Sequence, residues 1–177
     1  MKFVCVFCSA SDAIDSHYFE EARKIGNIFA ENNIGLVYGG AQCGIMGALA
    51  DGVLEKSGHV IGVFPEFLKD FEPMHEGITE QILVDDMHTR KKEMFERSDS
   101  ILVLPGGFGT LDETFEVITW KQIHTHNKQV IIYNYKGYWN KLIELFDSII
   151  DNKFANSKTN TLYDVIDKQE DILKYCK

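Results

Sequence analysis

The residues whose types and spacing are best suited to chemistry lie in Pro105–Glu113, which reads PGGFGTLDE. They follow the apolar run Ile101–Leu104 and precede a segment with helical periodicity. Three glycines between a buried strand and a helix allow the backbone to approach a ligand closely and to turn its amides toward it. Because a helix N-terminus adds partial positive charge, the pattern predicts a bound anion, above all a phosphate.

A second glycine cluster, Gly39–Gly47, follows the strand-like run Leu36–Tyr38 and leads into another helical pattern that ends near Lys56. Neither cluster has the G-x-G-x-x-G spacing of a dinucleotide site or the Gly-Lys-Ser/Thr of a P-loop, so neither hydride transfer nor NTP hydrolysis is favoured. A single glycine is usually a turn or a helix cap. Two strand–glycine–helix junctions in one small chain favour a ligand site instead.

Composition limits the function classes. The chain has 177 residues, 45% of them hydrophobic, enough for one domain over residues 1–177 with a substantial core. A net charge of −9 argues against nucleic acid or an anionic membrane as a partner. No apolar run approaches the roughly 20 residues of a membrane span, and the N-terminus does not read as a signal peptide. We therefore expect a soluble, cytoplasmic protein.

The elements that must position the glycine clusters alternate along the chain. Strands are expected at Phe3–Cys8, Gly35–Tyr38, Val60–Phe64, Gln81–Val84, Ile101–Leu104, Val130–Tyr133 and near Leu162–Ile166. Helices are expected at Ser16–Glu31, Gly44–Lys56, Met87–Arg97, Thr110–Ile123, Tyr138–Asp151 and Lys168–Tyr175. Apolar strands alternating with helices indicate an α/β fold, a Rossmann-like doubly wound parallel sheet of about seven strands with helices on both faces. Ligands bind beyond the carboxyl ends of such strands, where both glycine clusters lie.

A third informative segment is the expected helix that begins at Met87. Its apolar stripe is formed by Met87, Met94 and Phe95, and both Arg90 and Lys91 fall within that stripe. Cations in a core-facing stripe need anionic partners or pay a large desolvation penalty. One interpretation is that both side chains extend around the helix edge into water. The other is that one of them reaches a ligand phosphate or an acidic residue in the crevice.

Glu113 also has two interpretations. Thr110 and Glu113 fit the capping box S/T-x-x-E, in which the glutamate only secures the helix start. Alternatively, Glu113 and Glu116, one turn apart on the same helix face, form an acidic pair beside the anion site. Two carboxylates are unfavourable for simple phosphate binding. They suit a site where positive charge develops, as at a sugar carbon when a glycosidic bond breaks.

The cysteines and histidines suggest no further site. Cys5 and Cys8 have C-x-x-C spacing, but residues three apart on a strand point to opposite faces, so we interpret them as small buried apolar residues. The clusters His124–His126 and Asp85–Asp86 lack a familiar ligand spacing and are interpreted as solvated loop residues. We expect no metal site.

Together these segments resemble the Lonely guy (LOG) family of nucleotide phosphoribohydrolases, long mislabelled as lysine decarboxylases. The resemblance rests on P-G-G-x-G-T-x-x-E at Pro105–Glu113, on Arg90–Lys91 within MHTRKKEM, and on the glycines of Gly39–Gly52, and it extends beyond Trp120. It implies hydrolysis of the N-glycosidic bond of cytokinin riboside 5′-monophosphates, with no metal or organic cofactor. It also implies a homodimer in which partner helices help to complete the site.

Transferred by position, the resemblance implies that Arg90 and Glu113 are the catalytic pair. The implied substrate-binding residues are Glu72, Arg90, Lys91, Gly106, Gly107, Phe108, Gly109, Thr110, Leu111, Asp112, Glu113 and Thr119. Further possible contacts are Gly39, Gly40, Met87 and Glu116. The chain departs from the family in its first loop, Cys8–Asp12, where Gly-Ser-Ser is common, and at Ala41, where a third glycine is frequent. Both differences lie at the base-binding end.

Four other functions are compatible with parts of this pattern. A non-catalytic nucleotide-binding or carrier module can share the fold, since fold does not determine function. A general AMP nucleosidase would use the same site without preferring an N6 substituent. A pyridoxal-phosphate decarboxylase could use the glycine loop for its cofactor phosphate but needs a Schiff-base lysine as well. A metal hydrolase lacks a recognisable ligand set.

Overall fold

The strands expected from the apolar runs form one parallel sheet with the order β4-β3-β2-β1-β5-β6-β7 in the computed structural model, which describes residues 1–176. Their bounds are β1 Lys2–Phe7, β2 Ile34–Tyr38, β3 Val60–Pro65, β4 Glu80–Val84, β5 Ser100–Val103, β6 Gln129–Tyr133 and β7 Asp164–Ile166. The chain adds strands outward from β1 to β4 and then returns to place β5 on the other side of β1. The direction of winding therefore reverses between β1 and β5.

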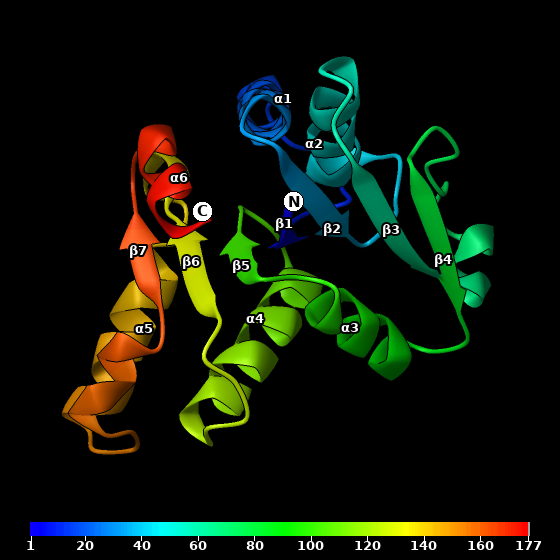
Figure 1. The fold of residues 1–177 in the computed structure, drawn as a ribbon. Coiled ribbons are helices and arrows are strands. Elements are labelled where there is room, and N and C mark those ends of the chain that lie inside the picture. The colour runs from blue at the N-terminus through cyan, green and yellow to red at the C-terminus, as the bar shows by residue number, and fades with distance from the viewer. Residues whose placement is uncertain (177) are drawn as a thin grey trace.

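Helices cover both faces of this sheet, as Figure 1 shows. One face carries α1 (Ser16–Glu31), α2 (Gly44–Glu55) and the short α6 (Ile172–Tyr175). The other carries α3 (Met87–Glu96), α4 (Phe108–Gln122) and α5 (Asn140–Asp151). Short 3-10 turns complete the chain at η1 Glu66–Asp70, η2 Tyr135–Gly137, η3 Ser157–Thr161 and η4 Gln169–Asp171. The predicted doubly wound α/β fold is confirmed.

Burial follows from this layering. Every residue of β2, β3 and β5 is buried, because helices cover both sides of the central strands, whereas the edge strand β4 alternates between less and more exposed residues. The apolar side chains form two cores, one on each face of the sheet. Cys5 belongs to the core beneath α3, α4 and α5, and Cys8 to the core beneath α1 and α2, so the two thiols point to opposite faces as predicted. Burial raises the pKa of both thiols.

Three predicted helix starts are wrong, and one of them is that of α5, which begins at Asn140 rather than Tyr138. α4 begins at Phe108 rather than Thr110, because Gly107 is the last extended residue and the chain turns into the helix directly after it. The C-terminal helix is restricted to Ile172–Tyr175, and the preceding Gln169–Asp171 forms a 3-10 turn with no buried residue to hold a longer α-helix against the sheet. The glycine loop is therefore shorter than expected, and its last glycine, Gly109, already belongs to the helix.

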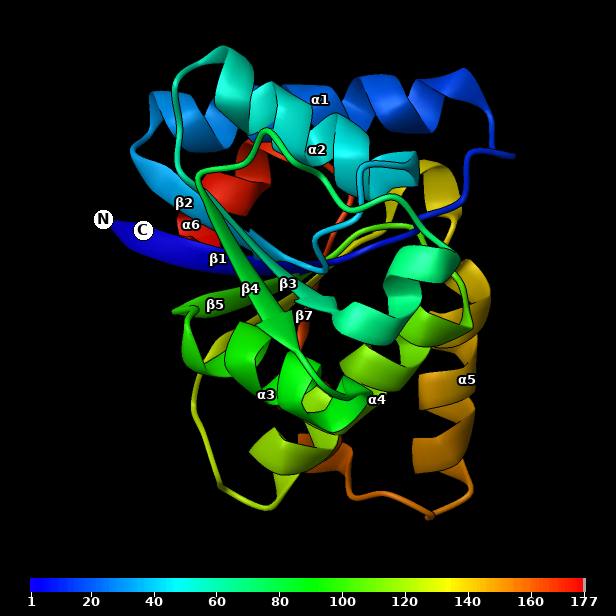
Figure 2. The ribbon, with the colours of Figure 1, turned by 90° about the vertical axis from the view of Figure 1, so that its right-hand side faces the viewer.

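The loops that follow β1, β3 and β5 gather at one end of the sheet, opposite the N-terminus, as Figure 2 shows. This is the carboxyl edge, and the reversal point between β1 and β5 lies within it. In a doubly wound sheet this is the expected place for a ligand. Within residues 1–176, no helix combines the length and apolar character needed to cross a membrane.

Candidate functional site

A cavity of about 540 Å³ opens at this carboxyl edge. It is bounded by the loops after β1 and β5, by η1 and its following segment, and by the starts of α3 and α4. The residues that line it are Cys8, Ser9, Ala10, Ser11, Met46, Phe67, Leu68, Glu72, Met87, Arg90, Gly107, Gly109, Thr110, Asp112 and Glu113. Its volume lies in the range of small-molecule sites.

The N-terminus of α4 faces this cavity through Gly107, Gly109 and Thr110. A Cβ atom added to Gly107 or Gly109 would meet nothing within 4 Å. Neither glycine is therefore required by a neighbouring protein group, and both leave room for a ligand to approach the backbone. An approaching anion would meet the amides and the positive end of a 15-residue helix.

Glu113 lies on α4 one turn beyond these glycines and is only 4% exposed. Burial raises the pKa of its carboxyl to about 7, although the nearby positive charge of Arg90 acts to lower it. The capping-box interpretation is wrong for this structure: Gly107 is the N-cap, and Thr110 lies inside the helix, where its carbonyl accepts a hydrogen bond from the Thr114 hydroxyl at 2.6 Å. Glu113 is a buried acid in the cavity wall, a common setting for catalytic carboxyl groups.

Arg90 is 6% exposed and is held by backbone carbonyls. Its Nε donates to the carbonyl of Val63 at 3.2 Å, and its Nη2 donates to the carbonyl of Gly39 at 3.0 Å. A Cβ at position 39 would lie 1.9 Å from Nη2, so Gly39 is what makes room for the guanidinium. The structure thus places this cation in the cavity wall with Glu113, and its orientation is fixed by a carbonyl of β3 and by that of Gly39, which follows β2.

Lys91 has the acidic partners that its buried position requires. Its Nζ lies 3.1 Å from a carboxylate oxygen of Asp112 and 3.1 Å from one of Glu116. Burial acts to lower the pKa of Lys91, but the hydrogen bonds to these two carboxylates outweigh it and raise the pKa. The prediction that one cation of the stripe reaches an acidic residue is confirmed. Glu116 is engaged in this ion pair rather than in the cavity lining.

The glycine cluster at Gly39–Gly47 is closed by protein groups. The amide of Gly44, at the start of α2, donates to Asp12 Oδ1 at 2.8 Å, and the amide of Met46 donates to the carbonyl of Ser9 at 3.1 Å. The sequence predicts that both clusters can line one crevice. Of residues 39–47, Met46 alone lines the cavity, so this cluster borders it through a side chain and not through an open helix start. The β1 loop occupies the start of α2, because Gly44 allows its backbone to pass close by.

The structure brings together about half of the predicted site residues. Those in the cavity wall are Glu72, Met87, Arg90, Gly107, Gly109, Thr110, Asp112 and Glu113. Those outside the lining are Gly39, Gly40, Lys91, Gly106, Phe108, Leu111, Glu116 and Thr119. Phe108 is 92% exposed, Leu111 packs toward the core, and the carbonyl of Gly106 accepts a hydrogen bond from the Tyr138 hydroxyl at 2.7 Å. Thr119 lies on an exposed face of α4 next to Phe115 and Ile118.

Several lining residues were not predicted. The loop of residues 8–11 was not among the named contacts, although the resemblance implies that it lies at the base-binding end; it reaches the cavity because it leaves β1 at the reversal point. Met46, Phe67 and Leu68 carry no motif, since apolar side chains on a helix or a turn normally pack into a core. Only the tertiary structure brings them to the cavity.

The histidine and aspartate clusters have structural contacts. Asp86 is the N-cap of α3 and accepts the Thr89 amide at 2.8 Å. His126 is half-buried, bonds the carbonyl of Val117 at 2.8 Å and packs against Phe95, so its interpretation as a solvated loop residue is wrong. Among residues 1–176, no three His, Cys, Asp or Glu side chains are grouped so that they could hold a metal ion.

The fold and cavity define a Rossmann-like α/β protein with a ligand-sized site at the reversal point of the sheet. The family model described as "Possible lysine decarboxylase" matches residues 46–176. The cytokinin riboside 5′-monophosphate phosphoribohydrolase LOG7 of Arabidopsis thaliana is 43% identical, with 88% of this chain and 71% of that protein covered. The probable cytokinin riboside 5′-monophosphate phosphoribohydrolase LOGL3 of Oryza sativa subsp. japonica is 37% identical, with 98% of this chain and 86% of that protein covered. The chain therefore belongs to the LOG family.

Solved structures with low sequence identity share the fold. The Moco carrier protein of Chlamydomonas reinhardtii superposes with a TM-score of 0.73 at 19% identity, covering 98% of this chain and 93% of that one. The molybdenum cofactor binding protein of Rippkaea orientalis has the same TM-score at 17% identity, with the same coverages. At such identities the likeness extends to the fold alone.

Proposed function

We propose that this protein hydrolyses the N-glycosidic bond of adenosine 5′-monophosphates, with or without an N6 substituent, to release the free base and ribose 5-phosphate. The curated relatives that carry this activity in their names support the proposal. The observation that carries it is the buried Glu113 carboxyl, with a pKa of about 7, one turn from an open helix start in a ligand-sized cavity. A phosphate site and a buried acid are the two elements that the reaction needs.

The phosphate is held at the start of α4. The amides of residues 107–110 and the helix dipole favour a dianion, and the open space over Gly107 and Gly109 lets it come within hydrogen-bond distance. Glu113 lies one helical turn further along, so a sugar attached to that phosphate would extend toward its carboxyl. Anchoring the phosphate in this way positions the ribose for reaction.

The reaction breaks the bond between the sugar C1′ and a base nitrogen. The oxygen of water bonds to C1′, and the departing base takes up a proton. The Glu113 carboxylate stabilises the positive charge that develops on the sugar and orients the attacking water. Arg90 is always protonated and is therefore a poor proton donor, so its role is electrostatic. It favours the ionised form of Glu113, although burial still leaves the pKa of that carboxyl at about 7, and it orients the bound nucleotide. No metal or organic cofactor is required.

The base packs against the apolar side chains of the cavity, which are Met46, Phe67, Leu68 and Met87. An N6 substituent would extend the same contact. The family description as a decarboxylase has less support, because a Schiff-base mechanism needs a lysine at the ligand. Within the described residues, no lysine lines the cavity, and the buried Lys91 is already paired with two carboxylates.

Chromatographic detection of base release tests this proposal. AMP and N6-isopentenyl-AMP are compared with the corresponding nucleosides. Losing the charge-assisted hydrogen bonds to phosphate, about 1.5–3 kcal/mol each, should lower kcat/KM for the nucleosides by several orders of magnitude. Comparable rates with adenosine and AMP would refute the phosphate anchor. The ratio between the two nucleotides distinguishes a cytokinin-releasing enzyme from a general AMP nucleosidase.

A non-catalytic carrier is the second candidate, because the Moco carrier protein shares this fold and a fold by itself does not determine function. The same assay separates the two. Tight AMP binding without base release after prolonged incubation would favour the carrier. The presence of Arg90 and Glu113 together in the cavity wall favours the enzyme.

We also propose that the protein is a cytoplasmic homodimer that associates through α4 and α5. An apolar hollow of about 120 Å³ lies between these helices, and Phe115 and Leu145 are partly exposed nearby on the same two helices. Thr119 lies in that hollow, outside the cavity of its own chain, so a contact with nucleotide would be made in the cavity of the second copy. A cytoplasmic location agrees with the four free cysteines. Sedimentation of the protein tests the dimer.

A further inference from the structure

The segment between η1 and β4 carries Glu72 to the cavity and is attached to the glycine cluster at Gly39–Gly47. The carbonyl of Pro73 accepts the Gln42 amide at 2.9 Å, Met74 forms an antiparallel bridge with Ala41, and the His75 amide donates to the carbonyl of Gly40 at 2.9 Å. The three residues that follow Glu72 therefore run antiparallel to residues 40–42. This short ladder begins directly after the carboxylate that lines the cavity.

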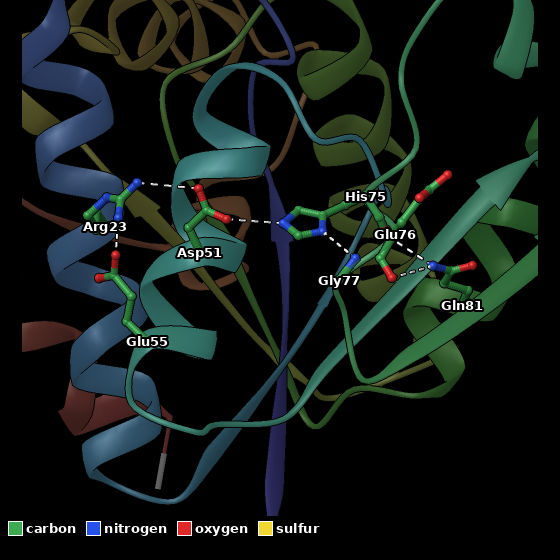
Figure 3. A network of polar contacts seen from close by, with 7 residues as sticks. All are labelled: Arg23, Asp51, Glu55, His75, Glu76, Gly77 and Gln81. Carbon is green, nitrogen blue, oxygen red and sulfur yellow. Dashed lines mark hydrogen bonds and ion pairs between the residues drawn. The ribbon is translucent and has the colours of Figure 1, made fainter.

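His75 is the most deeply buried attachment of this segment, and the partly buried Met74 and Ile78 also pack against the core. His75 is 5% exposed and is the only buried residue within 66–79, all of which the structure describes. Its Nε2 lies 3.1 Å from Asp51 Oδ1 on α2, and its Nδ1 lies 3.1 Å from the Gly77 amide, as Figure 3 shows. Because an amide can only donate, Nδ1 accepts, and the ring proton resides on Nε2 and is donated to Asp51.

Asp51 is itself held in place. Arg23 on α1 forms ion pairs with Asp51, at 3.3 Å, and with Glu55 one turn further along α2 (Figure 3). The two helices pack closely, since a Cβ on Gly26 would lie 2.3 Å from a carbonyl oxygen of α2. His75 is therefore bound to a rigid helix pair that covers the sheet. From the β4 side, the Gln81 amide group donates to the carbonyl of His75 at 3.2 Å.

We propose that His75 and Asp51 are positioning residues for Glu72, fixing its carboxylate at the wall of the cavity. This inference rests on the proposed function and on the nucleotide contact that the family resemblance implies for Glu72, which lines the cavity. A largely exposed segment shifts when its most deeply buried attachment is lost, and a contact misplaced by about 1 Å can reduce activity up to 100-fold. The main effect is on nucleotide affinity, because neither His75 nor Asp51 lines the cavity.

The test is a double-mutant cycle read by calorimetric AMP binding and by the KM for base release. The variants are His75→Asn, Glu72→Ala and the double substitution. Asparagine can still accept the Gly77 amide in an Asx turn but is too short to reach Asp51. We expect His75→Asn to raise the Kd and KM about tenfold in the parent, with little change in kcat, and less than twofold in the Glu72→Ala background.

Two further variants complete the design. His75→Gln places an amide donor near the position of Nε2, so it should restore most of the affinity lost in His75→Asn. His124→Asn is the matched control, because His124 is exposed after α4 and has a positive φ of 62° that asparagine accepts readily. It should leave Kd and KM unchanged. If His75→Asn does not fold, Asp51→Ala replaces it in the cycle, because it removes the same hydrogen bond from the Asp51 side.

Equal losses in the parent and Glu72→Ala backgrounds would show that His75 acts through general stability and would overturn the proposal. Failure to recover affinity in His75→Gln, with the fold intact, would also count against it. A parent protein that binds AMP without releasing base would contradict the proposed hydrolysis but not the positioning role, because the cycle is still read from Kd. The two failures are therefore distinguishable.

Discussion

The two strand–glycine–helix junctions look alike in sequence but differ in what approaches their glycines. The first junction is residues 39–47, before α2, and the second is residues 105–109, before and at the start of α4. At the first, a Cβ on Gly39 or Gly47 would collide with Arg90 Nη2 at 1.9 Å or with a backbone oxygen at 2.0 Å. At the second, a Cβ on Gly107 or Gly109 would meet nothing within 4 Å. The first junction uses glycine to pack protein against protein. The second does so only at Gly106, where a Cβ would lie 2.1 Å from Thr110 Oγ1, and it leaves space for a ligand at Gly107 and Gly109. A glycine motif therefore identifies a close approach but not the approaching group.

Electrostatics separate the two junctions in the same way. The amide of Gly44 at the start of α2 is satisfied by the carboxylate of Asp12, which supplies negative charge from the protein itself. The start of α4 borders the cavity, with Arg90 and the buried Glu113 nearby. Only the second helix start is available to a phosphate. The first holds in place Arg90 and the segment that carries Glu72.

The largest effect is expected at the second junction for Glu113→Gln. The substitution keeps the size of the side chain and removes the charge that stabilises the transition state, so turnover should fall about 100-fold or more. At about pH 5, where burial keeps Glu113 protonated in the ligand-free protein, the melting temperature should stay within a few degrees. Base-release kinetics and thermal unfolding check both parts. Glu96→Gln, at an exposed glutamate of α3, is the control, and normal turnover in Glu113→Gln would return Glu113 to a structural role.

The same residue predicts a pH dependence of stability in the ligand-free protein. Burial raises the pKa of Glu113 from 4.5 to about 7, so between these values the folded state holds a proton that the unfolded chain has lost. Unfolding then releases a proton, and the free energy of unfolding falls as pH rises through this window, by on the order of 3 kcal/mol. Urea unfolding at about pH 5 and pH 8 should show this fall in the parent but not in Glu113→Gln. Parallel profiles for both proteins would contradict the prediction.

At the first junction, Gly39→Ala should disturb the framework. The added methyl group displaces the Arg90 guanidinium from the carbonyls of Gly39 and Val63, leaving buried groups unpaired at a cost of about 2 kcal/mol. The melting temperature should fall by roughly 4–8 °C, and base release should fall with it. Calorimetry and the kinetic assay measure the two effects. An unchanged melting temperature would mean that Arg90 relaxes freely.

The smallest effect on the fold is expected for Gly107→Ala, the matched substitution at the second junction. The methyl group points into open space, so the melting temperature should change by no more than about 1–2 °C. It occupies the space a phosphate would use, so the KM for AMP should rise about tenfold. Thermal unfolding and steady-state kinetics make the comparison with Gly39→Ala direct. A large loss of stability here would remove the distinction between the junctions.

Much of this arrangement was predictable from the sequence. Apolar runs such as Ile101–Leu104 predicted the strands, because a strand covered on both faces needs apolar residues throughout. The buried position of Arg90 and Lys91 followed from helical periodicity. The partners of those two cations did not, because Val63, Gly39 and Asp112 are brought to them by separate elements.

The sequence by itself determined the doubly wound sheet, the carboxyl edge where ligands bind, and the residue types available there. Those properties depend on local periodicity and on the order of elements, which a linear chain displays directly. Only the tertiary structure decided which glycine junction stays open, that Glu113 is a buried acid rather than a cap, and that His75 fastens the Glu72 segment. Each of these depends on the distance between atoms far apart in the chain. A local pattern can show that a residue is buried, but not which distant group it approaches, because that depends on how the separate elements pack.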